Sequence, residues 1–222
     1  MISVFDLNRR EPLYNLRTIP SRKHTYSTQT MKGIVSTMGI SPDQGILAAG
    51  TFSSSVGLYD QEGSGDVIAI FSLAEKHENV FSQKGVTDIR WSHCGTYIYI
   101  AERKDDKISM WDVRKLFGKV ANLTGRDANT VQRLGIDSYL GEGGREVVVG
   151  GGLDGKVELW DVHMDTNPIN KWQAHNGEYG SSVYRSATLI ATRPCDVSCC
   201  EPSMAWTYSY MLRTKTPRPQ GH

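Results

Sequence analysis

The sequence of 222 residues lacks any apolar run near the ~20 residues that a membrane-spanning helix requires. Its N-terminus has no charged leader before a long apolar segment, so we expect neither a secretory signal nor membrane association. Its four cysteines, Cys94 and the group Cys195, Cys199 and Cys200, do not have the spacing of a disulfide framework. We interpret this cysteine usage as that of a reducing intracellular compartment.

Charge of one sign and catalytic motifs are also lacking. The net charge of +1 gives no whole-protein attraction to nucleic acid, although a local basic patch remains possible. No nucleophile elbow, zincin motif or paired set of zinc-spaced cysteines occurs, so we predict no catalytic residue, metal, cofactor or small-molecule substrate, and no enzyme. Residues 150–156 resemble the start of a phosphate-binding loop, but Val157 replaces the Ser/Thr that holds magnesium, which favours a hairpin turn.

What the sequence does contain is a repeat. Four short apolar runs end in an aromatic residue followed by aspartate, spaced by 54, 52 and 49 residues (60−6, 112−60 and 161−112). An aspartate also lies in the turn six residues before the aromatic in the last two repeats. A period of this size is typical of blade-type β repeats. The predicted repeat anchors are Tyr59, Asp60, Asp105, Trp111, Asp112, Asp154, Trp160 and Asp161.

Each repeat reads as four antiparallel strands, which predicts an all-β fold, a partial WD-repeat β-propeller of about four blades' worth. We expect the aromatic anchors on third strands and largely buried, and Val35, Met38 and Ile40 as core positions of a first strand. The predicted propeller segment covers residues 1–192. Its blades are placed at about 1–20 (partial), 31–73, 84–124, 131–175 and 180–192 (partial).

Two features of the chain's extent are also expectations. A seven-blade ring with repeats this long needs about 350 residues. We therefore favour a piece of a longer propeller over terminal halves that close into a four-blade ring. Residues 193–222 have no alternation and no aromatic-Asp anchor, and we interpret this irregular tail as a gene-model artefact, translated through an intron or out of frame.

Basic residues gather near the second repeat's central turn. Arg103, Lys104 and Lys107 flank this turn, while Arg126 and Arg133 lie in the connection to the next repeat. Because turns between second and third strands gather on one face of a propeller, part of this set can form a patch. The alternative is a solvated turn with its charge offset by nearby aspartates.

Three stretches resemble the telomerase Cajal body family of WD-repeat proteins and their fungal relatives. They are the hairpin at residues 50–59, the stretch from Ala101 to Arg114, and the connection at residues 123–133, which generic WD repeats lack. The resemblance covers about residues 2–192. The sequence departs from the family at Asn129-Thr130-Val131-Gln132-Arg133, where the family has Thr-Asn-Gln-Arg, and the blades expected after Thr192 are absent.

The resemblance implies a non-enzymatic nuclear scaffold that binds small Cajal body RNAs, telomerase RNA included, with ribonucleoprotein proteins as partners. The candidate RNA-binding residues are Arg103, Lys104, Arg126, Gln132 and Arg133. A budding-yeast relative implies an alternative, a splicing-associated factor. A further alternative is a protein-only scaffold such as a ubiquitin-ligase substrate receptor, because Trp111-Asp112-Val113-Arg114 matches the W-D-x-R pattern of such receptors.

Overall fold

The computed structural model describes residues 1–20, 30–73, 75–77, 80–82, 84–115 and 118–174. The chain divides into two compact units, Met1–Ala191 and Thr192–His222, and every described residue lies in the first. The predicted blade at 180–192 and the irregular tail therefore lie outside the described residues. Among the described residues, none of the helices has the length and apolarity that crossing a membrane requires.

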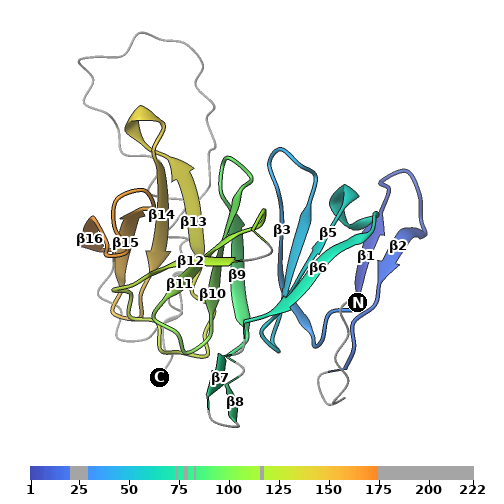
Figure 1. The fold of residues 1–222 in the computed structure, drawn as a ribbon, viewed down its shortest axis with the longest axis horizontal. Helices are drawn as coiled ribbons and strands as arrows, with labels where there is room; N and C mark the ends of the chain where they lie inside the picture. The colour runs from blue at the N-terminus through green and yellow to red at the C-terminus, as the bar shows by residue number, and fades with distance from the viewer. Residues whose placement is uncertain (21–29, 74, 78–79, 83, 116–117, 175–222) are drawn as a thin grey trace, which may run out of the picture. The chain divides into compact units, whose positions relative to one another are not determined.

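Three four-stranded antiparallel sheets form the body of the first unit, each with its strands in sequence order (Figure 1). The first contains β3 (Val35–Ile40), β4 (Leu47–Thr51), β5 (Ser55–Tyr59) and β6 (Val67–Ser72). The second contains β9 (Val86–Trp91), β10 (Tyr97–Glu102), β11 (Ile108–Asp112) and β12 (Gly118–Leu123). The third contains β13 (Ile136–Leu140), β14 (Glu146–Gly151), β15 (Lys156–Asp161) and β16 (Asn170–Gln173).

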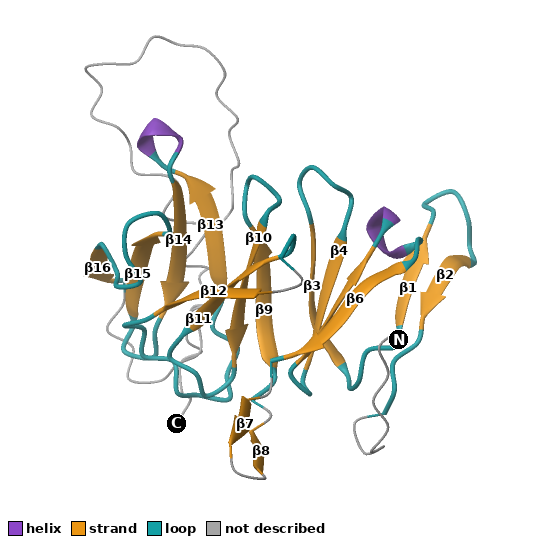
Figure 2. Ribbon diagram, viewed as in Figure 1, coloured by secondary structure: helices purple, strands orange, loops and turns teal. Residues whose placement is uncertain are grey.

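Two hairpins accompany these sheets. β1 (Ile2–Phe5) pairs with β2 (Pro12–Leu16), and β7 (Glu75–His77) pairs with β8 (Val80–Ser82). Figure 2 shows that strands dominate the fold. Its only helices within the described residues are the short 3-10 turns η1 (Gln61–Gly63) and η2 (Glu142–Gly144). This is the architecture of a partial β-propeller, and the predicted fold class is confirmed.

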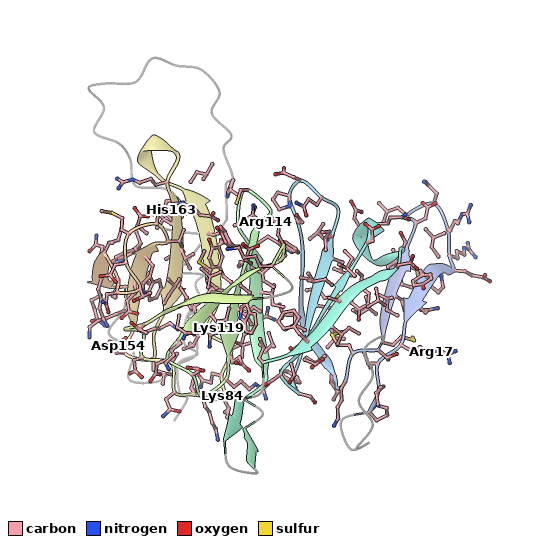
Figure 3. All side chains as sticks on the ribbon, in the orientation of Figure 1. Arg17, Lys84, Arg114, Lys119, Asp154 and His163 are labelled. Carbon is pink, nitrogen blue, oxygen red and sulfur yellow. The ribbon has the colours of Figure 1, made fainter. Side chains whose placement is uncertain are left out.

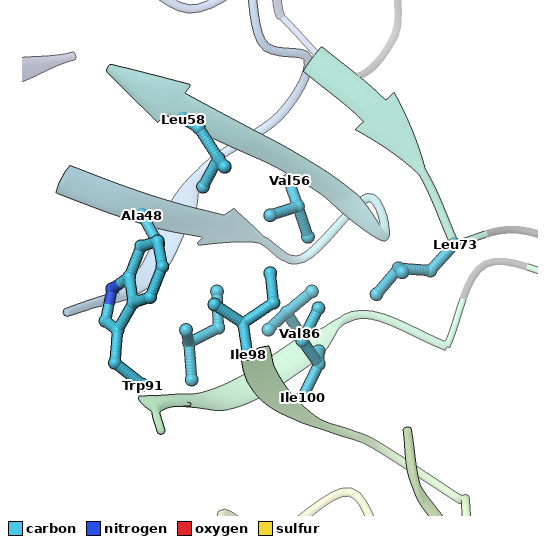
Figure 4. Close-up of a cluster of buried hydrophobic side chains, with 9 residues drawn as sticks. Ala48, Val56, Leu58, Leu73, Val86, Trp91, Ile98 and Ile100 are labelled. Atoms are coloured by element: carbon cyan, nitrogen blue, oxygen red, sulfur yellow. The ribbon is translucent and has the colours of Figure 1, made fainter. Parts of the chain in front are cut away.

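The core lies between the sheets, because each strand alternates its side chains between two faces. Ala48, Val56 and Leu58 of the first sheet pack against Ile98 and Ile100 of the second (Figure 4). The opposite face of the second sheet packs on the third through Tyr99, Ile108, Leu123, Val148 and Trp160. A third cluster joins the β1–β2 hairpin to the first sheet through Ile2, Leu16, Leu47, Ala49 and Tyr59.

The aromatic anchors lie on third strands as the sequence predicts, but their burial differs. Tyr59 at the end of β5 and Trp160 on β15 are buried, at 2% and 0% exposed. Trp111 on β11 is only half-buried, with its ring 5.1 Å from that of Phe71. Tyr59 and Trp160 therefore lie in the core as expected, whereas Trp111 is less completely buried and packs against the cluster between the first two sheets.

One correction concerns β3. Met38 and Ile40, predicted as core residues, are 51% and 53% exposed, and Val35 is half-buried. Met38 pairs with Ala49 and Ile40 with Leu47, whose side chains pack on the β1–β2 hairpin. That hairpin covers β4 and β5 but leaves these two β3 side chains exposed.

Candidate nucleic-acid interface

The predicted basic residues belong to two connections that meet at one end of the strands of the second sheet. This end is hereafter called the basic edge. Residues 103–107, hereafter the basic turn, join β10 to β11, and residues 125–133, hereafter the linker, lead from β12 to β13. The backbone N–H of Lys104 donates to the carbonyl of Thr130 at 2.8 Å, and the Ala128 N–H donates to Asp106 Oδ1 at 2.8 Å. The fold thus brings the two predicted halves of the site together.

The basic turn also contacts the turn between β4 and β5 in the preceding sheet. The Ser54 hydroxyl donates to Glu102 Oε1 at 2.8 Å and accepts from the Gly85 N–H at 2.8 Å. The Arg103 N–H donates to the Gly85 carbonyl at 2.9 Å. These bonds fix the basic turn on both sides, so its side chains extend from a rigid backbone.

The two acidic residues of the basic turn, Asp105 and Asp106, already accept hydrogen bonds from other groups of the chain. Asp105 accepts from Lys84 Nζ at 2.7 Å and from the Lys107 N–H at 3.1 Å, and Asp106 caps the linker. Among the described residues, no hydrogen-bond or salt-bridge partner occurs for the side-chain cations of Arg103, Lys104 or Lys107. Neither aspartate of the basic turn forms a direct ion pair with these three cations, and Asp106 keeps an exposed negative charge in the same turn.

The three cations differ in exposure and backbone geometry. Lys104 is exposed and adopts a left-handed conformation with φ +53°. A non-glycine residue in this region is strained by about 1 kcal/mol or more, and such strain is concentrated at functional sites. Arg103 is half-buried, and its guanidinium lies 3.9 Å above the Phe52 ring. The basic turn therefore presents the Arg103 guanidinium, stacked on an aromatic ring, and two exposed lysine side chains, Lys104 and Lys107.

Gln132 and Arg133 extend from the linker, both exposed. The Gln132 side chain makes no hydrogen bond within the described part of the chain, whereas Arg133 Nη2 donates to Asp88 Oδ1 at 3.4 Å. Asp88 is buried and also accepts from Thr37 Oγ1 and from the Ile136 N–H. Arg133 is thus partly a structural residue, although its side chain remains 44% exposed.

Arg126 is placed differently from the other candidates. It is only 3% exposed, and its Nε and Nη1 have no hydrogen-bond partner within the described residues. Burial lowers the pKa of its guanidinium to about 10, an effect that the nearby Glu158 carboxylate opposes. Glu158 is itself buried and contacts Lys171 Nζ. Arg126 is inaccessible to a ligand in this structure and lies inside the contact between the second and third sheets.

The remaining repeat anchors hold turns. Asp60 accepts from the Gln61 N–H at 2.8 Å, and Asp154 accepts from Lys156 through both its backbone and its side chain. Asp112 and Asp161, each 2% exposed, accept from backbone N–H groups two residues later. The Trp160 indole donates to the Thr124 carbonyl at 2.8 Å, which ties β15 to the start of the linker.

A pocket of about 250 Å³ opens beside the basic turn, on the side of the second sheet that faces the first. Its lining mixes charges with apolar groups: Leu73, Lys84, Glu102, Lys107, Trp111 and Lys119. Burial raises the pKa of Glu102, and the hydrogen bond from Ser54 partly opposes this shift. In the described part of the chain, no group of three or more His, Cys, Asp and Glu side chains has the arrangement of a metal site.

Sequence reasoning missed two residues of this edge, Phe52 and Asp88. Phe52 has a signal in the sequence, since it precedes Arg103 by 51 residues (103−52), close to the repeat period. Equivalent turns of neighbouring repeats are adjacent in space, so this interval predicts their contact. Asp88 has no comparable signal, because its role depends on partners in the first sheet, the third sheet and the linker.

Comparisons with known proteins agree with this architecture. Residues 75–112 match the family described as "WD domain, G-beta repeat". The chain contains a WD repeat and has the fold of WD-repeat proteins. This WD-repeat chain is 32% identical over 175 residues to a Schizosaccharomyces pombe protein named "Guanine nucleotide-binding protein negative regulator 1". That match covers 70% of the chain and 41% of the relative.

The WD-repeat chain is also similar to proteins named "Telomerase Cajal body protein 1", at 29% identity in Bos taurus and 30% in Homo sapiens. Each of these matches covers 74% of the chain but 29% of the relative. The predicted resemblance to this family is therefore confirmed. The chain spans well under half the length of each of these curated relatives.

A third kind of relative is the Danio rerio "DDB1- and CUL4-associated factor 10", 29% identical over 69% of the WD-repeat chain and 27% of the relative. The comparisons do not bear out the cysteine-based expectation of a reducing compartment. Cys94 is a free, exposed thiol, and the other cysteines lie outside the described residues.

Proposed function

We propose that this chain is a non-enzymatic nuclear scaffold that binds RNA at the edge formed by the basic turn and the linker. The observation that carries the proposal is the set of cations without partners on a turn whose own aspartates are engaged elsewhere. Cations held on a fixed backbone without a direct ion pair attract phosphates, and they lose no internal ion pair on binding.

The class of RNA follows from the kind of groups present. Sequence-specific recognition of RNA targets single-stranded loops and ends with arginine, aromatic rings and hydrogen-bonding side chains. Arg103, Lys104, Gln132 and Arg133 supply these groups, with Phe52 as the aromatic ring. Arg126 contributes from within, because its buried side chain packs where the linker meets the third sheet. Similarity to Telomerase Cajal body protein 1 supports small Cajal body RNAs as ligands, ribonucleoprotein proteins as partners and the nucleus as the location.

The test begins with crosslinking in cells to recover the bound RNA, followed by affinity measurements on the purified chain. Arg103→Ala with Lys104→Ala removes two cations from the basic turn. We expect weaker binding and a salt dependence whose log–log slope falls in magnitude by about 0.7 for each of the two cations that contacts a phosphate of single-stranded RNA.

A matched control removes two cations elsewhere. Arg9 and Arg10 lie in the exposed turn between β1 and β2, so Arg9→Ala with Arg10→Ala should leave affinity and salt slope unchanged. Equal losses from both double variants would show non-specific attraction and contradict the proposed site. Unchanged affinity of the Arg103/Lys104 variant, with its fold intact, would also contradict it.

A second candidate function has an observation of its own. Arg114, which completes the W-D-x-R pattern, is 61% exposed and is held by Asp112 through Nε at 3.3 Å and Nη2 at 3.2 Å. It lies at the end of the second sheet opposite Lys84 and the basic turn (Figure 3). The relative named as a DDB1- and CUL4-associated factor supports an adaptor role for this end. Affinity purification of the wild type and of Arg114→Ala, with a ubiquitin-ligase adaptor lost only from the variant, tests this role.

A further inference from the structure

Phe52 and Arg103 form a stack that belongs to two different sheets. Phe52 lies in the turn between β4 and β5 and is 41% exposed, while Arg103 begins the turn between β10 and β11. The guanidinium carbon lies 3.9 Å from the centre of the ring, which is cation–π geometry. The stack therefore combines an exposed aromatic ring with a delocalised cation on the basic edge.

The backbone beneath the stack is fixed. The Phe52 N–H donates to the Ile34 carbonyl at 3.0 Å, and the Arg103 N–H donates to Gly85. Gly85 has φ +86°, and a Cβ there would lie 2.8 Å from the Phe52 carbonyl oxygen. The segment before β9, which bonds to Arg103, thus approaches Phe52 at a distance that only glycine allows, and it helps to set the spacing between ring and guanidinium.

The guanidinium has no acceptor in the described part of the chain. Its Nε–H is buried without a hydrogen-bond partner, which destabilises the folded state because the donor is left unsatisfied. A structural arginine normally gains carbonyl or carboxylate bonds that offset this loss. Arg103 has only the ring, so its position is better explained by a ligand than by stability.

The surroundings of the stack are apolar on one side and cationic on the other. Ile34 is 68% exposed beside Phe52, and Lys104 extends into solvent from the residue after Arg103. An acidic peptide would use the cations and leave the ring and Ile34 unused. A planar, uncharged ring joined to a phosphate would use all of them.

We infer that the Phe52–Arg103 stack is a subsite for one unpaired nucleobase of single-stranded RNA, with Lys104 on an adjacent phosphate. This inference rests on the proposed RNA-binding function and adds the chemical element that it recognises. Base stacking on aromatic rings and guanidinium planes contributes about 1–3 kcal/mol per base, largely independent of sequence. The subsite therefore favours unpaired over duplex RNA more than it selects one base.

The test uses a mixed-sequence, unstructured RNA of about 12 nucleotides, within the usual site size, and the same RNA as a duplex. Phe52→Leu keeps the apolar volume but removes the π-face, and Phe52→Tyr keeps both. We expect Phe52→Leu to weaken single-strand binding by about 5- to 150-fold, as loss of one stacked base predicts, with the salt slope unchanged. Phe52→Tyr should bind within about twofold of wild type.

Abasic scanning of the same RNA gives a second, independent measurement. One abasic position should weaken wild-type binding about as much as Phe52→Leu does, and the two changes together should not add, because they remove the same contact. This measurement needs only the wild-type protein for its first half, so it remains informative if the leucine variant does not fold.

The outcomes separate the inference from the function on which it rests. Equal binding by wild type and a folded Phe52→Leu variant, or an abasic scan with no sensitive position, overturns the stacking subsite and leaves RNA binding in place. No measurable affinity of the wild type for either RNA overturns both. Binding of a glutamate-rich peptide that competes with the RNA and is insensitive to Phe52→Leu also overturns the subsite.

Discussion

Asp88 on β9 and Arg133 of the linker form an ion pair, 3.4 Å from Oδ1 to Nη2, that joins the second sheet to the entry of the third. The same carboxylate accepts from Thr37 in the first sheet and from the Ile136 N–H in the third. One buried aspartate therefore contacts all three sheets. Its partners account for both of its oxygens, so the charge is compensated from several directions.

Replacing Asp88 by alanine should lower the free energy of unfolding by about 3–5 kcal/mol, because it leaves buried donors without an acceptor. Urea denaturation measures the change. Asp43→Ala is the control, since Asp43 is exposed and away from this network, and it should stay within about 0.5 kcal/mol of wild type. Equal effects of the two substitutions would contradict the role given to Asp88.

The two tryptophan anchors should respond differently to truncation. Trp160→Ala empties a fully buried aromatic site and should cost about 3–5 kcal/mol. Trp111 is half-buried, so Trp111→Ala should cost about 2 kcal/mol, in line with the smaller area removed from water. Denaturation midpoints at constant m-value test the order. A loss below about 1 kcal/mol for Trp160 would contradict its place in the core.

Glu102 predicts a dependence of stability on pH. Burial raises its pKa above the ordinary value of 4.5. The folded state then holds this proton more tightly than the unfolded state, so its contribution is present below the ordinary pKa and is lost as pH rises through the raised one. Glu102→Gln should flatten this fall and make the protein equally or more stable at pH 7.

Urea titrations between pH 4 and 7 test the Glu102 prediction, with Glu11→Gln as an exposed control that leaves the pH profile unchanged. A steeper loss of stability with rising pH in the Glu102 variant would contradict the assigned direction of the pKa shift.

Substitution of Lys104 should weaken RNA binding without lowering the stability of the fold. Glycine adopts positive φ without strain, so Lys104→Gly should leave the free energy of unfolding unchanged or raise it by about 0.5 kcal/mol. The same variant should bind single-stranded RNA more weakly, because a phosphate contact is lost. A Lys104 side chain with no part in binding would give unchanged affinity, which calorimetry or fluorescence anisotropy detects.

Arg126 should behave in the opposite way to Arg103. Arg126→Ala removes buried packing and leaves Glu158 with Lys171 as its remaining cation, so we expect a loss of about 2–4 kcal/mol in stability. Arg103→Ala removes one partly exposed cation–π contact, which is worth about 0.5–1 kcal/mol. Thermal unfolding of the two variants distinguishes a supporting arginine from a ligand-binding one.

The repeat pattern predicts the fold well because it depends on local alternation and on turn residues. Trp160 and Tyr59 lie where the aromatic-Asp spacing places them. The same alternation could not show that Met38 and Ile40 are exposed, because that depends on which strands cover β3. Apolar periodicity shows which face of a strand is apolar, but it does not show which other element covers that face.

Charge in the sequence was a weaker guide than contacts in space. The sequence grouped Arg126 with Arg103, yet one is buried between sheets and the other lies on an aromatic ring. Only the structure sorts these arginines, since burial and the presence of acceptors depend on residues far apart in the chain. The contact between Phe52 and Arg103 is the exception, because the repeat period predicts that these two residues lie side by side.

The hydrogen bonds that join the turns along the basic edge have a mechanical consequence. Ser54 of the first blade is bonded to Gly85 and Glu102 of the second, Lys104 to Thr130, and Leu153 to Asp127, so successive blades are linked through their turns and the linker. A force applied at one turn is therefore shared by the neighbouring turns, and the basic edge resists shear as one continuous structure. A flexible RNA strand bound along it would meet the binding groups at fixed intervals.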